Sequence, residues 1–516
     1  MAYKIYVNCS IYTQTLMAAI HIVKFIQSLN EKEIQIIDDH IQSIYLLSRS
    51  SSTNDSKQLK LFRFISSNKD RVLTDNELSK HIGTVNLSSL KYLLSEKIYD
   101  ALLLSKHIEN KTIYTKNQQI YFTLKKRIIL VKTLYRTLTQ GRIETINFLL
   151  TETIKTAKEN EIYDVLVESL IFYKYIKGIR LGVAEFEKIS KEILFYDSCL
   201  KSVRDANDAY FRLILNQDFI NSLTKKELEH HISNSIKQME LDYKKTKAQE
   251  VNYYLHILKI ALYENEKNFN MAIDYCKKLL LMIKKSTVLY SKERIGFAIS
   301  NLTQFNVLIG NYKEAALNAK KGQQFYIFNS FNYIMLKEQE FYAHFYAKNF
   351  KYVSKCTDEL LQHSLADTGE FRKAKYIYYQ ASLLFVTKQF KEALQLLNKS
   401  LEIEKDKARW NIALRTLNIM VFIELNKINE ASRSLEALRK YMERLTKSDE
   451  VKQRDILIIK LLREIEKDGF RFDPKNTNAT KMLKELSEKN KPVSWNYYTP
   501  ELIPFHEWVK GTAVKK

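Results

Sequence analysis

Apolar residues recur at helical spacing along most of the chain. Between residues 11 and 48 they fall three or four positions apart, which predicts two amphipathic helices. All four prolines lie after residue 473, and the 516 residues include only 10 glycines. Because proline and glycine are the usual breaks in loops and strands, their scarcity favours helices joined by short turns. The pattern predicts an all-α protein.

One short unit recurs in the second half of the chain. A polar turn is followed by an aromatic or apolar residue, and a small residue (valine in one copy) stands three positions later. The leading residues lie 43, 38, 40 and 38 positions apart and are Phe269, Tyr312, Phe350, Phe390 and Ile428. Apolar helical stretches flank each unit. A helical hairpin repeated at a near-constant interval is typical of an α-solenoid.

The best-formed copy is the stretch Gly310-Asn311-Tyr312-Lys313-Glu314-Ala315. It resembles the tetratricopeptide repeat (TPR) family, in which a turn glycine, an aromatic residue and an alanine stand in this order. A later copy, with Phe390 and Ala393, matches the last two places. The resemblance is clearest over residues 250–445 and extends back to about residue 125. It implies an irregular right-handed α-solenoid of TPR-like hairpins.

The patterns divide the chain into three predicted parts. These are an N-terminal helical module (1–125), a TPR-like array (126–445), and a capping helix with a proline- and tryptophan-containing tail (446–516). Weaker copies of the unit at 141–146 and 181–184 extend the array upstream. We expect Trp495 and Trp508 of the tail to pack on the array.

Residues 74–104 have the pattern of a helix-turn-helix. Thr74 and Glu77 have the spacing of a capping box, and Gly83 marks the turn. In DNA-binding proteins the second helix of such a pair enters the major groove. Here that helix is mostly apolar, and the residues expected to be exposed are few: Ser89, Lys91, Tyr92 and Glu96. Ordinary helix packing is the favoured interpretation.

The formal charge of +23 is compatible with an acidic partner such as nucleic acid. A general bias toward Lys, Ile, Asn and Tyr is the favoured explanation. The densest basic stretch, residues 110–143, contains no acidic residue and has aromatic residues between its cations. Its predicted contact residues are Lys111, Lys116, Lys125, Lys126, Arg127, Lys132 and Arg136. The simpler interpretation is an amphipathic helix with a basic solvent face.

Motifs of catalysis and cofactor binding are missing from the sequence. There is no glycine-rich phosphate loop, no G-x-S-x-G elbow and no H-E-x-x-H motif. The four cysteines are scattered without a C-x-x-C pair, which favours a reducing cytoplasm over a disulfide or zinc framework. The N-terminal region contains no uninterrupted apolar run that is long enough to span a membrane. We expect a cytoplasmic protein with no cofactor, no metal and no enzymatic activity.

In the TPR family the first helix of each hairpin lines a concave groove, where partner peptides lie. The resemblance therefore implies a groove that includes Tyr254, Phe297, Glu338, Tyr342, Tyr346, Lys375, Tyr378 and Phe385. Aromatic side chains in a groove suit a peptide with apolar anchors. The leading hypothesis is a scaffold for a protein or peptide, with the partner and the oligomeric state open. The alternative is a bacterial-type transcriptional or nucleic-acid-associated regulator, in which a basic N-terminal module accompanies a TPR-like sensor.

Overall fold

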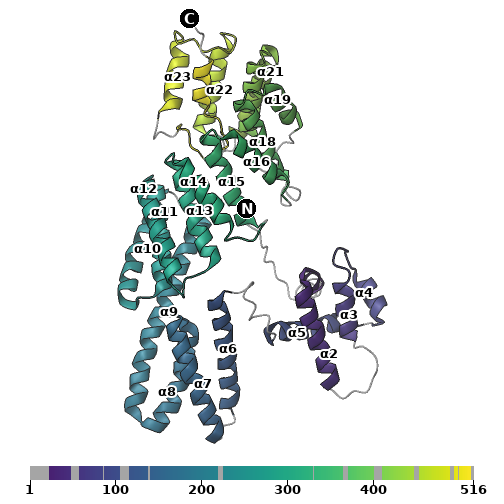
Figure 1. Cartoon of the computed structure of the whole chain (residues 1–516), viewed down its shortest axis with the longest axis vertical. Coiled ribbons are helices and arrows are strands. Elements are labelled where there is room, and N and C mark those ends of the chain that lie inside the picture. Colours follow the sequence, from purple (N-terminus) through teal and green to yellow (C-terminus); the bar gives the residue numbers. More distant parts are fainter. Residues whose placement is uncertain are drawn as a thin grey trace. The chain divides into compact units, whose positions relative to one another are not determined.

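The computed structural model describes most of the chain as helices joined by turns (Figure 1). The described residues are 22–47, 57–84, 86–104, 115–136, 140–218, 225–328, 330–363, 370–399, 410–446, 452–488, 493–497 and 499–512. Within these ranges no strand occurs and consecutive helices pack on one another, so the predicted all-α solenoid is confirmed. The chain has two compact units, Met1–Thr224 and Lys225–Lys516. The predicted borders after residues 125 and 445 stay predictions.

In the first unit, four helices share one apolar core: α2 (Glu31–Leu47), α3 (Lys57–Ser66), α4 (Asp75–Ile82) and α5 (Leu87–Leu104). The predicted cap of α4 is confirmed. The Thr74 hydroxyl accepts from the Glu77 backbone N–H, and the Glu77 carboxylate accepts from the Thr74 N–H. Gly83 ends the helix with a φ of 66°, a left-handed conformation that glycine adopts without a steric penalty.

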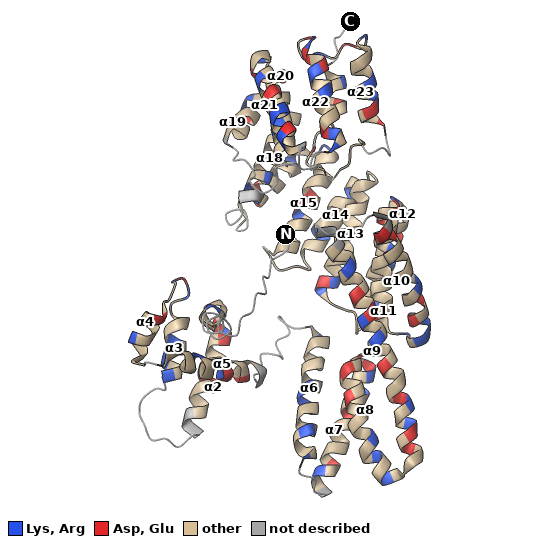
Figure 2. Ribbon diagram, turned by 180° about the vertical axis from the view of Figure 1, so that it is seen from behind, with Lys and Arg blue, Asp and Glu red and all other residues tan. Residues whose placement is uncertain are grey.

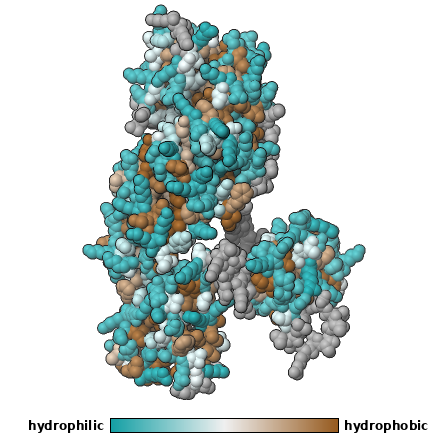
Figure 3. All heavy atoms as spheres, in the orientation of Figure 1, coloured by the Kyte–Doolittle hydropathy of each residue, from teal (hydrophilic) through white to brown (hydrophobic). Residues whose placement is uncertain are grey.

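Four further helices of this unit pack in consecutive order: α6 (Lys116–Tyr135), α7 (Gln140–Glu159), α8 (Tyr163–Leu181) and α9 (Val183–Asp218). The predicted copy at 181–184 falls at the turn between α8 and α9, but Ala184 is exposed, unlike the small residues of the later copies. Apolar side chains stay at the surface there, with Ile179 84% and Val183 72% exposed. Figure 3 shows such hydrophobic patches on this part of the molecule.

The second unit consists of helical hairpins in a continuous array. Its helices are α10 (Lys225–Thr246), α11 (Gln249–Asn265), α12 (Phe269–Lys285), α13 (Lys292–Leu308), α14 (Tyr312–Gln323), α15 (Phe331–Tyr346), α16 (Phe350–Leu361), α18 (Glu370–Val386), α19 (Phe390–Lys399), α20 (Trp410–Glu424), α21 (Ile428–Thr446), α22 (Gln453–Glu466), α23 (Thr477–Ser487) and α24 (Phe505–Gly511). The hairpins pair α11 with α12, α13 with α14, α15 with α16, α18 with α19, α20 with α21, and α22 with α23. We call the two members of each pair the first and the second helix.

The recurring unit of the sequence marks where the second helices begin. Its five leading residues are the first residues of α12, α14, α16, α19 and α21. The small residues three positions later are all fully buried, with 0% exposure: Ala272, Ala315, Val353, Ala393 and Ala431. A small side chain at this place lets the second helix approach its neighbours closely. The hairpin interpretation of the unit is therefore confirmed.

In the five hairpins that carry the recurring unit, the turn contains one residue in the left-handed conformation, two positions before the second helix. The φ values are 57° at Lys267, 81° at Gly310, 58° at Lys348, 64° at Lys388 and 56° at Asn426. The backbone N–H of the following residue donates to a carbonyl of the first helix, as from Asn311 to Asn306 at 2.8 Å and from Gln389 to Leu384 at 2.8 Å. This bond satisfies a carbonyl at the helix end.

A last hairpin and a C-terminal segment complete the second unit. We use the name C-terminal segment for residues 493–497 and 499–512, which include α24. Its side chains Leu502, Phe505 and Val509 are fully buried in the core of the array. The indole N–H of Trp495 donates to the Glu501 carbonyl at 2.9 Å, and that of Trp508 donates to the Glu424 carboxylate at 2.8 Å. The expected packing of the tail on the array is confirmed.

The left-handed lysines give a test of the turn geometry. We predict that Lys388→Gly raises the free energy of unfolding by about 1 kcal/mol, because a left-handed residue with a Cβ is strained and glycine is not. The control is Gln395→Gly, at an exposed position within α19, which should lower stability by about 1 kcal/mol. Urea unfolding of the full chain measures both. A loss of stability in Lys388→Gly would contradict the proposed turn geometry.

Candidate functional site

The first helices of the hairpins form one layer, and polar contacts join α11 to α13, α13 to α15, and α15 to α18. The pairs are Glu250 with Arg294 at 2.7 Å, Glu264 with Gln304 at 3.0 Å, Gln339 with Ser300 at 3.3 Å, and Glu338 with Lys375 at 2.7 Å. The hydroxyls of Tyr342 and Tyr379 add a bond of 2.8 Å between α15 and α18. The layer is therefore fixed by side chains as well as by the turns.

The predicted groove residues all belong to this layer, but they differ in their surroundings. Tyr254 on α11 and Phe297 on α13 are partly exposed. Glu338 and Lys375 form the ion pair between α15 and α18, where Glu338 also accepts from the Tyr376 hydroxyl at 2.9 Å. Phe385 packs on Phe390 of its own hairpin, with ring centroids 5.4 Å apart. Partner binding at these residues stays a prediction.

Of the other three predicted residues, Tyr346 and Tyr378 contact the C-terminal segment, and Tyr342 is buried with its ring centroid 6.2 Å from that of Tyr346. The Tyr346 hydroxyl donates to the Tyr497 carbonyl at 3.1 Å, and its ring lies edge-on to Trp495 and Tyr497 with centroids 5.5 and 4.9 Å away. The Tyr312 hydroxyl donates to the Tyr497 hydroxyl at 3.0 Å. Tyr378 is only 3% exposed, and its hydroxyl forms a hydrogen bond with the Leu502 backbone. This part of the layer thus holds an extended segment of its own chain.

Arg454 of α22 anchors the same segment. Its guanidinium forms two bonds to the Glu501 carboxylate, at 2.6 and 2.7 Å. It also donates to the carbonyls of Leu486 at 3.2 Å and Val493 at 2.5 Å. The neighbouring Asp455 is half-buried near Glu501, and desolvation followed by the charge of Glu501 raises the pKa of Asp455 to about 6. Burial, and then the charge of Arg454, lowers the pKa of His506 to about 4.

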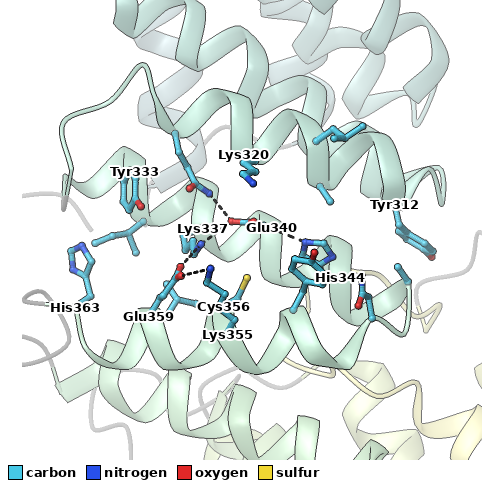
Figure 4. Close-up of a pocket in the computed structure, with 18 of the residues that line it drawn as sticks. Tyr312, Lys320, Tyr333, Lys337, Glu340, His344, Lys355, Cys356, Glu359 and His363 are labelled. Carbon is cyan, nitrogen blue, oxygen red and sulfur yellow. Dashed lines mark hydrogen bonds and ion pairs between the residues drawn. The ribbon is translucent and has the colours of Figure 1, made fainter.

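A large pocket lies on the other side of α15, between the second helices α14 and α16 (Figure 4). It has a volume of about 1180 Å³. The floor is α15, whose middle carries four consecutive polar residues, Lys337, Glu338, Gln339 and Glu340, each at most 9% exposed. Lys337 and Glu340 face the pocket, whereas Glu338 and Gln339 contact the neighbouring first helices.

The floor of the pocket is a connected polar network. Lys337 donates to Glu340 at 3.0 Å and pairs with Glu359 of α16, and Gln323 of α14 donates to Glu340 at 2.7 Å. Burial alone would lower the pKa of Lys337, but the bond to Glu359 and the charge of Glu340 outweigh it and raise that pKa. Burial lowers the pKa of His344 and raises that of Cys356 to about 12, so both are uncharged at neutral pH.

Two lysines of the predicted basic surface have carboxylate partners on a neighbouring helix. Figure 2 shows cations along α6 and acidic residues on neighbouring helices of the unit. Lys125 pairs with Asp164 of α8 at 2.9 Å, and Lys132 pairs with Glu168. The other described members of the set are Lys116, Lys126, Arg127 and Arg136, while Lys111 lies outside the described residues. Leu124, Ile128 and Val131 are buried, as the amphipathic interpretation of α6 requires.

The expected exposure of Lys91 on the second helix of the 74–104 motif is wrong. Lys91 is 2% exposed, and its ammonium pairs with Asp75 at 2.6 Å. Asp75 is the first residue of α4, so the lysine reaches from α5 to the N-terminus of that helix. Tyr92 and Glu96 are exposed. Among the four residues expected to be exposed, the one cation is therefore unavailable to a phosphate.

Among the residues that the structure describes, no group of three or more His, Cys, Asp and Glu side chains is placed to hold a metal ion. Across the described helices, none combines the length and apolar character needed to cross a membrane.

The fold and the site define an all-α helical-repeat protein. No family model matches the chain, and no curated protein matches it. A solved structure that matches is a Signal Transduction ATPase with Numerous Domains (STAND) protein with a tetratricopeptide repeat sensor, from Pyrococcus horikoshii. The two chains are 13% identical, the alignment covers 86% of this chain and 67% of the other, and the TM-score is 0.43. The likeness concerns the helical fold alone.

Several contacts of the site could not be read from the sequence. The bonds from Tyr346 and Tyr312 to Tyr497 span 151 and 185 positions, and no local pattern signals them. The pocket had one available signal, which is the polar run Lys337–Glu340 in the middle of an otherwise apolar first helix. Such a run is unusual where all faces of a helix are buried, because buried polar groups need partners.

The raised pKa of Asp455 leads to a prediction about pH. A carboxyl group with a raised pKa contributes stability below its unfolded pKa near 4, and that contribution is lost as the pH rises through about 6. Asp455→Asn, which removes the half-buried charge, should therefore raise the free energy of unfolding at pH 8 by on the order of 2 kcal/mol. The gain over the unsubstituted chain should vanish below about pH 4. The exposed Asp468→Asn should show no such pH-dependent gain, and a destabilised Asp455→Asn at pH 8 would contradict the argument.

Proposed function

We propose that this chain is a non-enzymatic scaffold that binds an extended segment of a partner protein on its layer of first helices. The observation that carries the proposal is the C-terminal segment itself. It lies against Tyr346 and Tyr378 through ring contacts and through bonds between tyrosine hydroxyls and the segment backbone. Aromatic anchors give affinity, while backbone bonds accept different sequences, and both are features of peptide-recognition surfaces.

The chemistry of the segment suggests the chemistry of the partner. Residues 493–503 contain three aromatic residues and one proline: Trp495 and Tyr497 stand at alternate positions, and Tyr498 and Pro500 follow. Trp495 and Tyr497 pack on each other with centroids 4.5 Å apart and on Tyr346. A partner segment with two aromatic residues at this spacing would make the same contacts. The C-terminal segment would then be a competitor that a partner displaces.

Contacts in the first unit weigh against the alternative of a nucleic-acid-associated regulator. Lys91 is buried, and Lys125 and Lys132 already have carboxylate partners. The electrostatic part of nucleic-acid binding depends on lysine and arginine side chains that can replace counterions on phosphates. We therefore propose the scaffold function alone.

The peptide-binding proposal can be tested in the full chain after the C-terminal segment is weakened. We expect a labelled peptide of residues 493–503 to bind the double variant Trp495→Ala, Tyr497→Ala at least about tenfold more tightly than the unsubstituted chain. The reason is that a tethered segment competes at an effective concentration of about a millimolar. Fluorescence anisotropy measures the affinities, and circular dichroism checks that the variant folds.

Two further substitutions in the double variant separate recognition from general surface effects. Tyr346→Ala should remove peptide binding, whereas Tyr290→Ala, at a tyrosine that is 51% exposed and lies outside the segment contacts, should leave it unchanged. A protein partner captured by the double variant should be released by the same peptide. A folded double variant that binds no peptide at millimolar concentration would refute the proposal.

The alternative makes a separate prediction about salt. Nucleic-acid binding through α6 would weaken steeply with salt and would be lost on the reversal of Lys126 and Arg127 to glutamate. The scaffold proposal instead expects that binding of a 30-base-pair duplex, measured by anisotropy at 50 mM salt, is the same in the double charge reversal and in the unsubstituted chain. A loss of tenfold or more on charge reversal would favour the alternative.

A further inference from the structure

The pocket between α14 and α16 is separate in chemistry from the surface that holds the C-terminal segment. It opens between two second helices, and its floor is polar and charged. Its volume of about 1180 Å³ is large enough for a small organic molecule with room for water. We infer that this pocket binds a small organic polyanion that carries a planar ring.

The charges that line the pocket favour an anion. The lining contains five lysines (Lys313, Lys320, Lys337, Lys348 and Lys355) and two glutamates (Glu340 and Glu359). Both carboxylates are already engaged by Lys337, and Lys355 lies 3.8 Å from Glu359. Among the described residues, Lys313, Lys320 and Lys348 form no ion pair. These three ammonium groups leave the cavity with an excess of positive charge.

Lys320 has the best position for contact with a ligand. Figure 4 shows its side chain reaching from α14 over the space above Glu340, opposite Lys337 and Lys355. An anion placed in this space would lie between cations from three different helices, α14, α15 and α16. Because the space is flanked by protein, the attraction is screened less than at an open surface.

Aromatic rings stand at both ends of this charged centre. At one end His344 and Tyr352 are stacked with centroids 4.9 Å apart and an interplanar angle of 17°. At the other end Phe328 lies edge-on to Tyr333 with centroids 5.2 Å apart. The imidazole of His344 is uncharged at neutral pH because burial lowers its pKa. A planar ring can pack on either pair while charged groups of the same molecule reach the lysines.

The polar network of the pocket floor supports a binding role, because buried ion pairs add little net stability when they serve packing alone. Replacing a buried ion pair by apolar residues of similar volume is often neutral or stabilising. Here Lys337 and Glu340 are at most 9% exposed, and each needs partners from a second helix to be satisfied. The network keeps the acidic side chains neutralised, so that the lysines of the rim determine the charge that a ligand meets.

The experiment is isothermal titration of the full chain with four probes. ATP carries both phosphates and a ring, tripolyphosphate and citrate carry charge without a ring, and adenosine carries the ring alone. We expect ATP to bind with a dissociation constant below about a millimolar, and tripolyphosphate or citrate to bind at least about tenfold more weakly. Adenosine should bind more weakly still. The comparison of tripolyphosphate with citrate tells phosphate from carboxylate recognition.

Matched charge reversals connect the binding to the pocket. Lys320→Glu, at an exposed residue of the pocket, should weaken ATP binding at least about tenfold. Lys321→Glu makes the same charge change one residue further along α14, at an exposed position outside the pocket, and should leave binding within about twofold. Tyr352→Ala should weaken ATP but not tripolyphosphate.

Three outcomes would overturn the inference. One is that no probe binds below about 10 mM while the chain is folded. Another is that Lys320→Glu and Lys321→Glu weaken binding equally, since that is the behaviour of a general surface field in a chain of charge +23. The third is that a polyglutamate peptide binds at the pocket and the small anions do not, which would assign the groove to an acidic protein segment.

Discussion

The close approach of helices at the small residue of each hairpin is the constraint on which the second unit depends. Ala272, Ala315, Val353, Ala393 and Ala431 have no exposed surface. They lie in the first turn of the second helix, five positions after the left-handed residue that reverses the chain. The turn sets the direction of the second helix, and the small side chain sets how near it can come. A larger side chain at these positions would force the helices apart, because protein interiors have few voids to receive it.

This arrangement explains why the residue at the left-handed turn position varies among the five copies, whereas the residue at the buried position stays small. The left-handed position holds glycine once, lysine three times and asparagine once in the five copies. A lysine costs about 1 to 2 kcal/mol there, which the remaining contacts of a hairpin can offset. The buried position tolerates nothing larger than valine in the five copies. The sequence therefore keeps the packing feature and lets the turn residue change, which makes the repeat recognisable but uneven.

The hairpins could be predicted from the sequence because their determinants are local. A turn, an apolar wedge and a small residue lie within six positions, and the first residues of α12, α14, α16, α19 and α21 agree with the pattern. The contacts of the C-terminal segment could not be predicted, because Tyr346 and Tyr497 approach only after the array has formed. The expected exposure of Lys91 is wrong for a related reason, because its acidic partner lies on another helix. A lysine on a mainly apolar helix suggests exposure, yet an acidic partner on α4 makes its burial acceptable.

The C-terminal segment is held by two kinds of contact with different consequences. Arg454 uses its guanidinium for the Glu501 carboxylate and for two backbone carbonyls, and it is 6% exposed. Such a buried pair contributes little net stability against an apolar replacement, but it admits only one alignment of the segment. The rings of Trp495 and Tyr497 bury apolar area on Tyr346 and make few directional bonds.

The aromatic contacts and the Glu501 ion pair occupy different parts of the C-terminal segment. The aromatic part, residues 495–497, lies upstream of the Glu501 anchor, and Leu502, Phe505 and Val509 are fully buried beyond it. Release of the two rings therefore exposes Tyr346 without the loss of the ion pair or of the buried α24 side chains. The energy needed for such release is that of a few ring contacts, the bonds to Tyr497 and the bond from the Trp495 indole to the Glu501 carbonyl. A surface covered in this way stays protected from water, yet a segment with similar rings can compete for it at modest affinity.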